Sequence, residues 1–189
     1  MPTGLRPLSP PVVFGQPGAS PLPFPAYAPP LIYLSAAPTA GALQVETATA
    51  AGTASATGTA QVTVTSTLLP GGTKTIPVAI TNADSATAIG GKIRAALAAD
   101  NDIIEHFTVG GATTAVVLTV RQEAANDTGL NIAIATGTAT GVTAAPTSTN
   151  TTTGVAGTGG IVGQEAKVGT TFYKLVSDNP HTWRTITLA

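Results

Sequence analysis

Residues 61–99 read QVTVTSTLLPGGTKTIPVAITNADSATAIGGKIRAALAA, and this stretch decides the fold. At its start, Val62 and Val64 alternate with polar residues, which is the two-residue period of a half-buried strand. Leu-Pro-Gly-Gly at 69–72 predicts a turn, and residues 73–81 alternate again. We therefore predict a β-hairpin, and its second strand should lie at a sheet edge because its central proline lacks an N–H donor.

The end of the same stretch predicts the main helix, over residues 84–99. Asp84 or Ser85 is suited to the N-cap, and one apolar stripe follows at i, i+4 and i+8, formed by Ile89, Ile93 and Leu97. Gly90 and Gly91 lie inside this helix, where each glycine costs about 1 kcal/mol relative to alanine. We therefore expect the helix to approach the sheet closely at these glycines.

The residues that follow the helix predict more strands. Asp100 is suited to cap a short helical turn, and residues 107–120 alternate on both sides of Gly110-Gly111, as in a second hairpin. A last alternating strand contains Leu130, Ile132 and Ile134. The order β-β-α-β-β predicts an α+β fold, with a small antiparallel or mixed β-sheet and one covering helix. We assign this core domain to residues 41–155.

The sequence contains two polar segments, one inside the core domain and one that extends beyond its end. Residues 123–129 predict a polar loop, and Arg121 and Glu123 are expected to be exposed where the second hairpin closes. Residues 136–160 are rich in Thr, Gly and Ala, and the composition leaves two interpretations open. The segment is either a linker or contributes a strand near residues 150–155.

An extended Pro-rich N-terminal arm is predicted at residues 1–40. Residues 1–38 hold 11 of the 15 prolines and a single charged side chain, Arg6. Proline removes backbone donors and favours extended chain, so neither a helix nor a central strand is expected here. The arm also carries apolar side chains that a polar linker lacks, so we expect it to be ordered against another chain rather than to be a disordered tail. Its candidate interface residues are Phe14, Phe24, Tyr27, Leu31 and Tyr33.

The last part, residues 156–189, is predicted to be a Gly-rich linker followed by a C-terminal β-hairpin. Its strands are expected at residues 170–176 and 183–188, joined by the turn-forming sequence Ser-Asp-Asn-Pro-His. Because an isolated hairpin is marginally stable in water, it should dock on the body, on the arm or on another copy. Two interpretations remain open for Phe172, Tyr173 and Trp183, which are either interface anchors or a small core.

Composition and charge argue against several classes of partner. Charged residues make up only 9% of the chain, and the net charge is −1 with the eight basic residues scattered. We therefore expect no nucleic-acid partner and no membrane partner. There is no cysteine, no run of about 20 apolar residues and no N-terminal signal pattern.

The residue patterns predict no enzyme. Ser177, Asp178 and His181 lie within five residues of one turn, where the geometry of a catalytic triad is not expected. Asp100, Asp102 and Glu105 lack the glycine and the spacing of a calcium loop, so they are interpreted as an acidic helix start. We predict no catalytic residue, no cofactor, no metal and no small-molecule substrate.

Residues 46–155 resemble a domain of tailed-phage virion proteins and related prophage proteins. The resemblance is carried by ETATAAGTASATGTAQVTVTS, by KTIPVAITNADSATAIGGKIRAALAAD and by FTVGGATTAVVLTVRQEAANDTGLNIAIATGTATGV. The matching motif residues are Asp84, Lys92, Ile93, Arg94, Leu97, Leu130, Ile132 and Ile134. GQEAKVGTTFYKLVSDNPHTWRTI, at residues 163–186, is similar to a short hairpin of phage head-fibre and decoration proteins.

The resemblance implies a virion structural protein without a catalytic residue. Within that setting it implies a capsid decoration (cement) protein that binds the major capsid protein on the phage head surface, forms a homo-oligomer, as a trimer, and is made in the host cytoplasm. One alternative is a tail, baseplate or fibre component. Another class is a bacterial surface or carbohydrate-binding module, which Thr-rich β domains also resemble.

Overall fold

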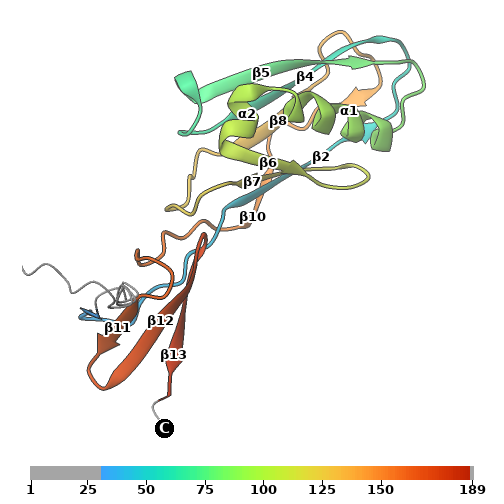
Figure 1. Ribbon diagram of the computed structural model, residues 1–189. Coiled ribbons are helices and arrows are strands. Elements are labelled where there is room, and N and C mark those ends of the chain that lie inside the picture. The colour runs from blue at the N-terminus through green and yellow to red at the C-terminus, as the bar shows by residue number, and fades with distance from the viewer. Residues whose placement is uncertain (1–30, 188–189) are drawn as a thin grey trace, which may run out of the picture.

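A computed structural model describes residues 31–187 of the chain (Figure 1). The candidate residues Phe14, Phe24 and Tyr27 lie outside this range. In chain order the elements are β1 (Ile32–Tyr33), β2 (Val45–Thr49), β3 (Ala51–Gly52), β4 (Gly58–Thr65), a 3₁₀ turn (Pro70–Gly72), β5 (Thr73–Ile80), α1 (Ala86–Ala98), α2 (Asn101–His106), β6 (Phe107–Gly110), β7 (Ala115–Val120), β8 (Asn131–Ala135), β9 (Val142–Thr143), β10 (Thr149–Thr152), β11 (Glu165–Val168), β12 (Thr171–Asp178) and β13 (His181–Ile186).

The α+β class is confirmed, and the predicted first hairpin is β4 paired with β5. Val62 and Val64 of β4 are buried, as are Ile76, Val78 and Ile80 of β5. In the three-stranded sheet β5-β4-β8, β5 is an edge strand. Pro77 therefore lies on an edge strand, as the sequence predicts, and edge strands are where proline is tolerated in sheets.

The strands are divided among several sheets, whereas the sequence predicts one sheet of four or five strands. The second hairpin, β6 with β7, belongs to a separate sheet of order β10-β2-β7-β6, and β3 pairs with β9 in a two-stranded sheet. β2 contacts β8, which joins this sheet to β5-β4-β8, and α1 contacts both β5 and β7 (Figure 1). One helix thus covers two sheets, and their apolar faces share a core.

The main helix has the predicted cap and stripe. Ser85 is the N-cap, and its hydroxyl accepts a hydrogen bond from the backbone N–H of Ala88 at 3.3 Å. Ile89, Ile93 and Leu97 are buried in the core. Asp84 lies just before the cap, where its carboxylate accepts from the Thr81 N–H at 2.7 Å and pairs with Lys92.

Of the two helical glycines, only Gly90 marks a close approach. A Cβ at Gly90 would lie 2.8 Å from the carbonyl oxygen of Thr113, in the loop before β7. A Cβ at Gly91 would instead meet the end of the Arg94 side chain, at 3.8 Å. The expected approach therefore occurs at one position, and the partner is this loop rather than a strand.

The Thr- and Gly-rich segment 136–160 contributes to the body. β10 pairs with β2, close to the strand expected near residues 150–155, and β9 pairs with β3. The isolated bridge between Ala145 and Ile134 adds a further pairing. This segment is thus paired with the body through short strands and bridges rather than being a free linker.

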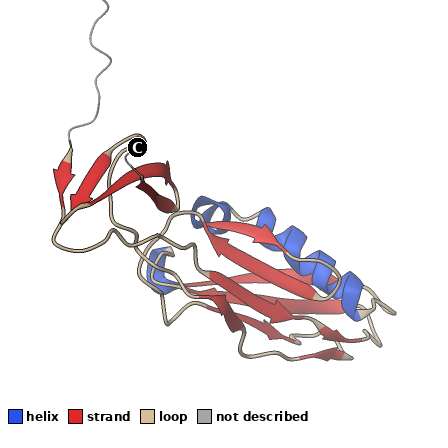
Figure 2. Cartoon of the chain, turned by 90° about the horizontal axis from the view of Figure 1, so that it is seen from below, coloured by secondary structure: helices blue, strands red, loops and turns tan. Residues whose placement is uncertain are grey.

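The C-terminal part forms a four-stranded sheet of order β1-β11-β12-β13, which we call the C-terminal sheet. β12 and β13 are the predicted hairpin, with a two-residue turn between Asp178 and His181. β1 comes from the predicted arm and pairs in parallel with β11. Figures 1 and 2 show this sheet at one end of the molecule, beside the body. In the range 31–187, neither helix is long and apolar enough to cross a membrane.

Candidate functional site

The C-terminal sheet brings together the candidate residues that the structure describes. Leu31 and Tyr33 lie at β1, Phe172 and Tyr173 on β12, and Trp183 on β13. Strand pairing then decides which of them share a face, because residues directly opposite each other point to the same side of a sheet.

One face of the C-terminal sheet, the covered face, carries Ala166, Tyr173, Leu175 and Trp183. Ala166 is opposite Tyr173, and Leu175 is opposite Trp183. Ala166 and Leu175 are buried, and Tyr173 and Trp183 are half-buried. The pairing of Leu175 with Trp183 depends on a β-bulge at Val176, where the register shifts by one residue.

The chain before β11 packs on the covered face. The Trp183 indole Nε1 donates a hydrogen bond to the carbonyl oxygen of Thr158 at 2.9 Å. A Cβ at Gly160 would lie 3.1 Å from Leu175 Cδ2 and 3.2 Å from Trp183 Cζ2. Of the two interpretations of Trp183, the structure therefore favours the small core, with Leu175 at its centre.

The opposite face, the open face, carries the remaining aromatic candidates. One row crosses all four strands, from Tyr33 to Lys167, Phe172 and Ile186. The Lys167 ammonium lies 5.2 Å from the centre of the Phe172 ring, within the range of a cation–π contact. Tyr33 is 76% exposed.

A second row on the open face is charged. Glu165 of β11 is opposite Lys174 of β12, which is opposite Arg184 of β13, and all three are exposed. Leu31, two residues before Tyr33, is also exposed. The amino-acid sequence alone does not group these basic residues. Each of them lies on a different strand, so grouping them needs the register of three strands.

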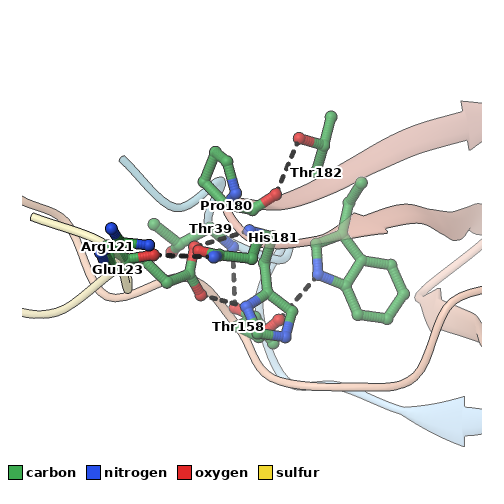
Figure 3. Close-up of polar contacts among 9 residues, drawn as sticks. Thr39, Arg121, Glu123, Thr158, Pro180, His181 and Thr182 are labelled. Atoms are coloured by element: carbon green, nitrogen blue, oxygen red, sulfur yellow. Dashed lines mark hydrogen bonds and ion pairs between the residues drawn. The ribbon is translucent and has the colours of Figure 1, made fainter. Parts of the chain in front are cut away.

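Glu123 lies at the joint between the body and the C-terminal sheet, and not in the exposed position that the sequence predicts. Its carboxylate accepts a hydrogen bond from the His181 backbone N–H at 2.6 Å and pairs with the His181 ring (Figure 3). Burial raises the pKa of Glu123, but hydrogen bonds from His181 and from the Gly157 N–H outweigh it and hold the pKa below its ordinary value. Glu123 thus holds the start of β13.

Other hydrogen bonds fasten the same joint. The Asn179 side chain donates to the Arg121 carbonyl at 2.8 Å, and the Gly41 N–H donates to the His181 carbonyl at 2.8 Å. The Thr39 N–H donates to the Thr158 hydroxyl at 2.8 Å (Figure 3). The histidine ring of the Ser177, Asp178 and His181 group therefore faces Glu123 of the body, in line with a structural role.

A buried carboxyl group lies between the two sheets of the body. Glu46 on β2 is 3% exposed, and one of its oxygens accepts from the Ser148 hydroxyl at 2.6 Å. Its other oxygen, Oε2, is buried and has no hydrogen-bond partner among the described residues. Burial raises the pKa of Glu46, and the hydrogen bond from Ser148 offsets only part of this effect.

We expect the stability of the protein to fall as the pH rises because of Glu46. A carboxyl group whose pKa is raised by folding stabilises the protein fully below its unfolded-state pKa, and this contribution is lost as the pH rises through the folded-state pKa. Glu46→Gln removes the titration, so urea unfolding between pH 4 and pH 8 should lack this decline. The exposed Glu105→Gln is the control, and an unchanged decline in the Glu46 variant would contradict the assignment.

Comparison with protein-family models, with curated proteins and with solved structures finds no match to this chain.

Proposed function

We propose that the protein is a non-enzymatic capsid decoration protein of a tailed phage. In this proposal it is made in the host cytoplasm, forms a trimer and binds the major capsid protein on the surface of the assembled head. The arm and the C-terminal sheet make the contacts, and the body holds them in place. The stabilisation of the head is non-covalent.

The observation that carries this proposal is the place where the arm joins the fold. β1 is the end of the predicted arm, and it forms an edge strand of the sheet that also holds Phe172 and Trp183. The described end of the arm and the strands with Phe172, Tyr173 and Trp183 therefore belong to one sheet at one end of the molecule (Figure 2). This arrangement favours a docking role, because an extended segment and a sheet can contact the same partner.

The composition of the arm supports the same role. An extended segment that becomes ordered on binding loses conformational entropy, and prolines reduce this loss because they restrict the free chain. The three arms of a trimer would bind with a high effective local concentration, so contacts that are weak singly become strong together.

Two truncations test the proposal by separating the arm from β1. A variant that begins at Leu31 keeps β1, and a variant that begins at Thr39 removes it as well. We expect both bodies to fold and both variants to lose binding to heads purified without the protein. The loss should be roughly tenfold or more, since several contacts disappear together. Cosedimentation of the variants with heads measures the binding.

The two variants differ in whether β1 is present. The longer variant begins at Leu31, just before β1. It therefore retains the pairing of β1 with β11 and loses only the contacts made by residues 1–30. Full head binding by the variant that begins at Thr39 would refute the docking role of both the arm and β1. Failure of the intact protein to bind heads would refute the decoration function itself.

A further inference from the structure

The open face of the C-terminal sheet has an unusual charge balance for this chain. It carries three of the eight basic residues, Lys167, Lys174 and Arg184, and a single carboxylate, Glu165. Seven of the nine acidic residues lie elsewhere, in the body. The face therefore has an excess of two positive charges on a protein whose net charge is −1.

Lys174 and Arg184 of the open face differ from the two lysines of the body in their contacts. Lys74 pairs with Asp100 and Asp102, and Lys92 pairs with Asp84. Among the residues that the structure describes, Lys174 and Arg184 take part in no ion pair within 4.0 Å. Their charges are thus available to groups of another molecule.

The aromatic row gives the same face an apolar centre. Tyr33, Phe172 and Ile186 lie side by side across the strands, with the Lys167 stem between Tyr33 and Phe172. Large aromatic side chains beside basic residues are the composition of protein interaction hot spots, where the apolar row is buried and the charges select the partner.

We infer that the open face binds an acidic protein surface, with Tyr33 and Phe172 on its apolar part and with Lys174 and Arg184 opposite its carboxylates. The inference rests on the proposed function to the extent that this surface belongs to the capsid. A nucleic acid fits less well, because Glu165 lies in the charged row beside Lys174 and would oppose a continuous line of phosphates.

The test uses the full-length protein and two labelled probes. One probe is a random copolymer of glutamate and tyrosine, which offers carboxylates and apolar rings, and the other is an oligothymidylate. Fluorescence anisotropy in about 0.1 M salt gives each dissociation constant. We expect the copolymer to bind more tightly than the oligothymidylate, and its affinity to fall as salt is added.

Two variants and one control locate the binding. Lys174→Gln with Arg184→Gln should weaken copolymer binding roughly tenfold, as expected for two exposed ion pairs. Tyr33→Ala should weaken it as well without loss of fold, because this side chain is largely exposed. The control, Thr87→Glu with Ala95→Glu, lowers the net charge equally at exposed positions of α1 and should bind as the wild type does.

The outcomes separate this inference from its alternatives. Tighter binding of the oligothymidylate, no copolymer binding by the wild type, or equal weakening in the α1 control would overturn it. A change of oligomeric state in the Tyr33 or the double variant, measured by light scattering, would show instead that a second copy covers the face.

Normal head binding by the double variant would overturn this inference and leave the decoration function intact. Copolymer binding without head binding would support the inference and refute that function.

Discussion

Replacing Asp127 by Ala should lower the free energy of unfolding by about 3 kcal/mol, because its carboxylate joins its own loop to the chain after β4. Its Oδ2 accepts hydrogen bonds from the Ser66 hydroxyl at 2.9 Å and from the Thr67 N–H at 2.8 Å. Its Oδ1 accepts from the Gly129 N–H at 2.9 Å. Gln44 holds the Asp127 backbone through both ends of its amide. The change would leave buried Ser66 and the Thr67 N–H without this partner.

The pH dependence identifies the carboxylate as the cause. Burial raises the pKa of Asp127, but hydrogen bonds from Thr67, Ser66 and Gly129 outweigh it and lower the pKa below its ordinary value. Such a group stabilises the protein above its unfolded-state pKa, and the contribution is lost as the pH falls through the folded-state pKa. Urea unfolding should therefore show a large difference between wild type and variant at pH 7 and a smaller one near pH 3.

A control for Asp127 is available on the surface. Asp178 is exposed near the β12–β13 turn, so Asp178→Ala should change the free energy of unfolding by about 0.5 kcal/mol or less. If Asp127→Ala were equally mild, or if its effect were the same at pH 7 and pH 3, the hydrogen bonds of this carboxylate would not be holding the loop.

Replacing Leu175 by Ala should unfold the C-terminal sheet while the body stays folded. Leu175 is fully buried on the covered face, and truncation of a buried leucine typically costs about 2–5 kcal/mol. The small core around Leu175 and Ala166 is separate from the main core of the body. A four-stranded sheet with so few buried side chains has little stability to lose.

Hydrogen exchange distinguishes local from global unfolding in this variant. We expect amide protection to disappear across β11, β12 and β13 and to persist in β4 and α1, and chymotrypsin to cleave at Phe172, Tyr173 or Trp183. The neighbouring Val176→Ala removes an exposed side chain and should leave protection in place. Loss of protection throughout the body would show that the two cores unfold as one unit. Head binding should decrease in the Leu175 variant, since the proposed docking surface would be lost.

Local patterns predicted the secondary structure of the body well. The first hairpin, the edge position of the strand with Pro77 and the Ile89, Ile93, Leu97 stripe all follow from periods of two and 3.6 residues. The division into separate sheets could not be predicted, because the period shows which side of a strand is buried but not which strand pairs with it. The contact between β2 and β8 joins residues far apart in the chain.

The candidate interface residues show the same limit of prediction from the sequence. Alternation and aromatic content were enough to select Phe172, Tyr173 and Trp183 and to predict their two strands. The sequence could not assign their faces, because the bulge at Val176 shifts the register of β13 by one residue. Without this bulge, Arg184 would lie opposite Leu175 on the covered face, and Trp183 would point to the open face.

The sequence by itself thus determined the hairpins β4–β5, β6–β7 and β12–β13, the strand β8 and the helix α1, since the period of apolar residues, the caps and the turns are local properties. Only the tertiary structure decided that β1 joins the C-terminal sheet, that Glu123 meets His181 and that three basic residues share a face with Tyr33 and Phe172. The physical reason is that each of these depends on strand register and on packing between distant segments, where one inserted residue reverses the side to which every following side chain points.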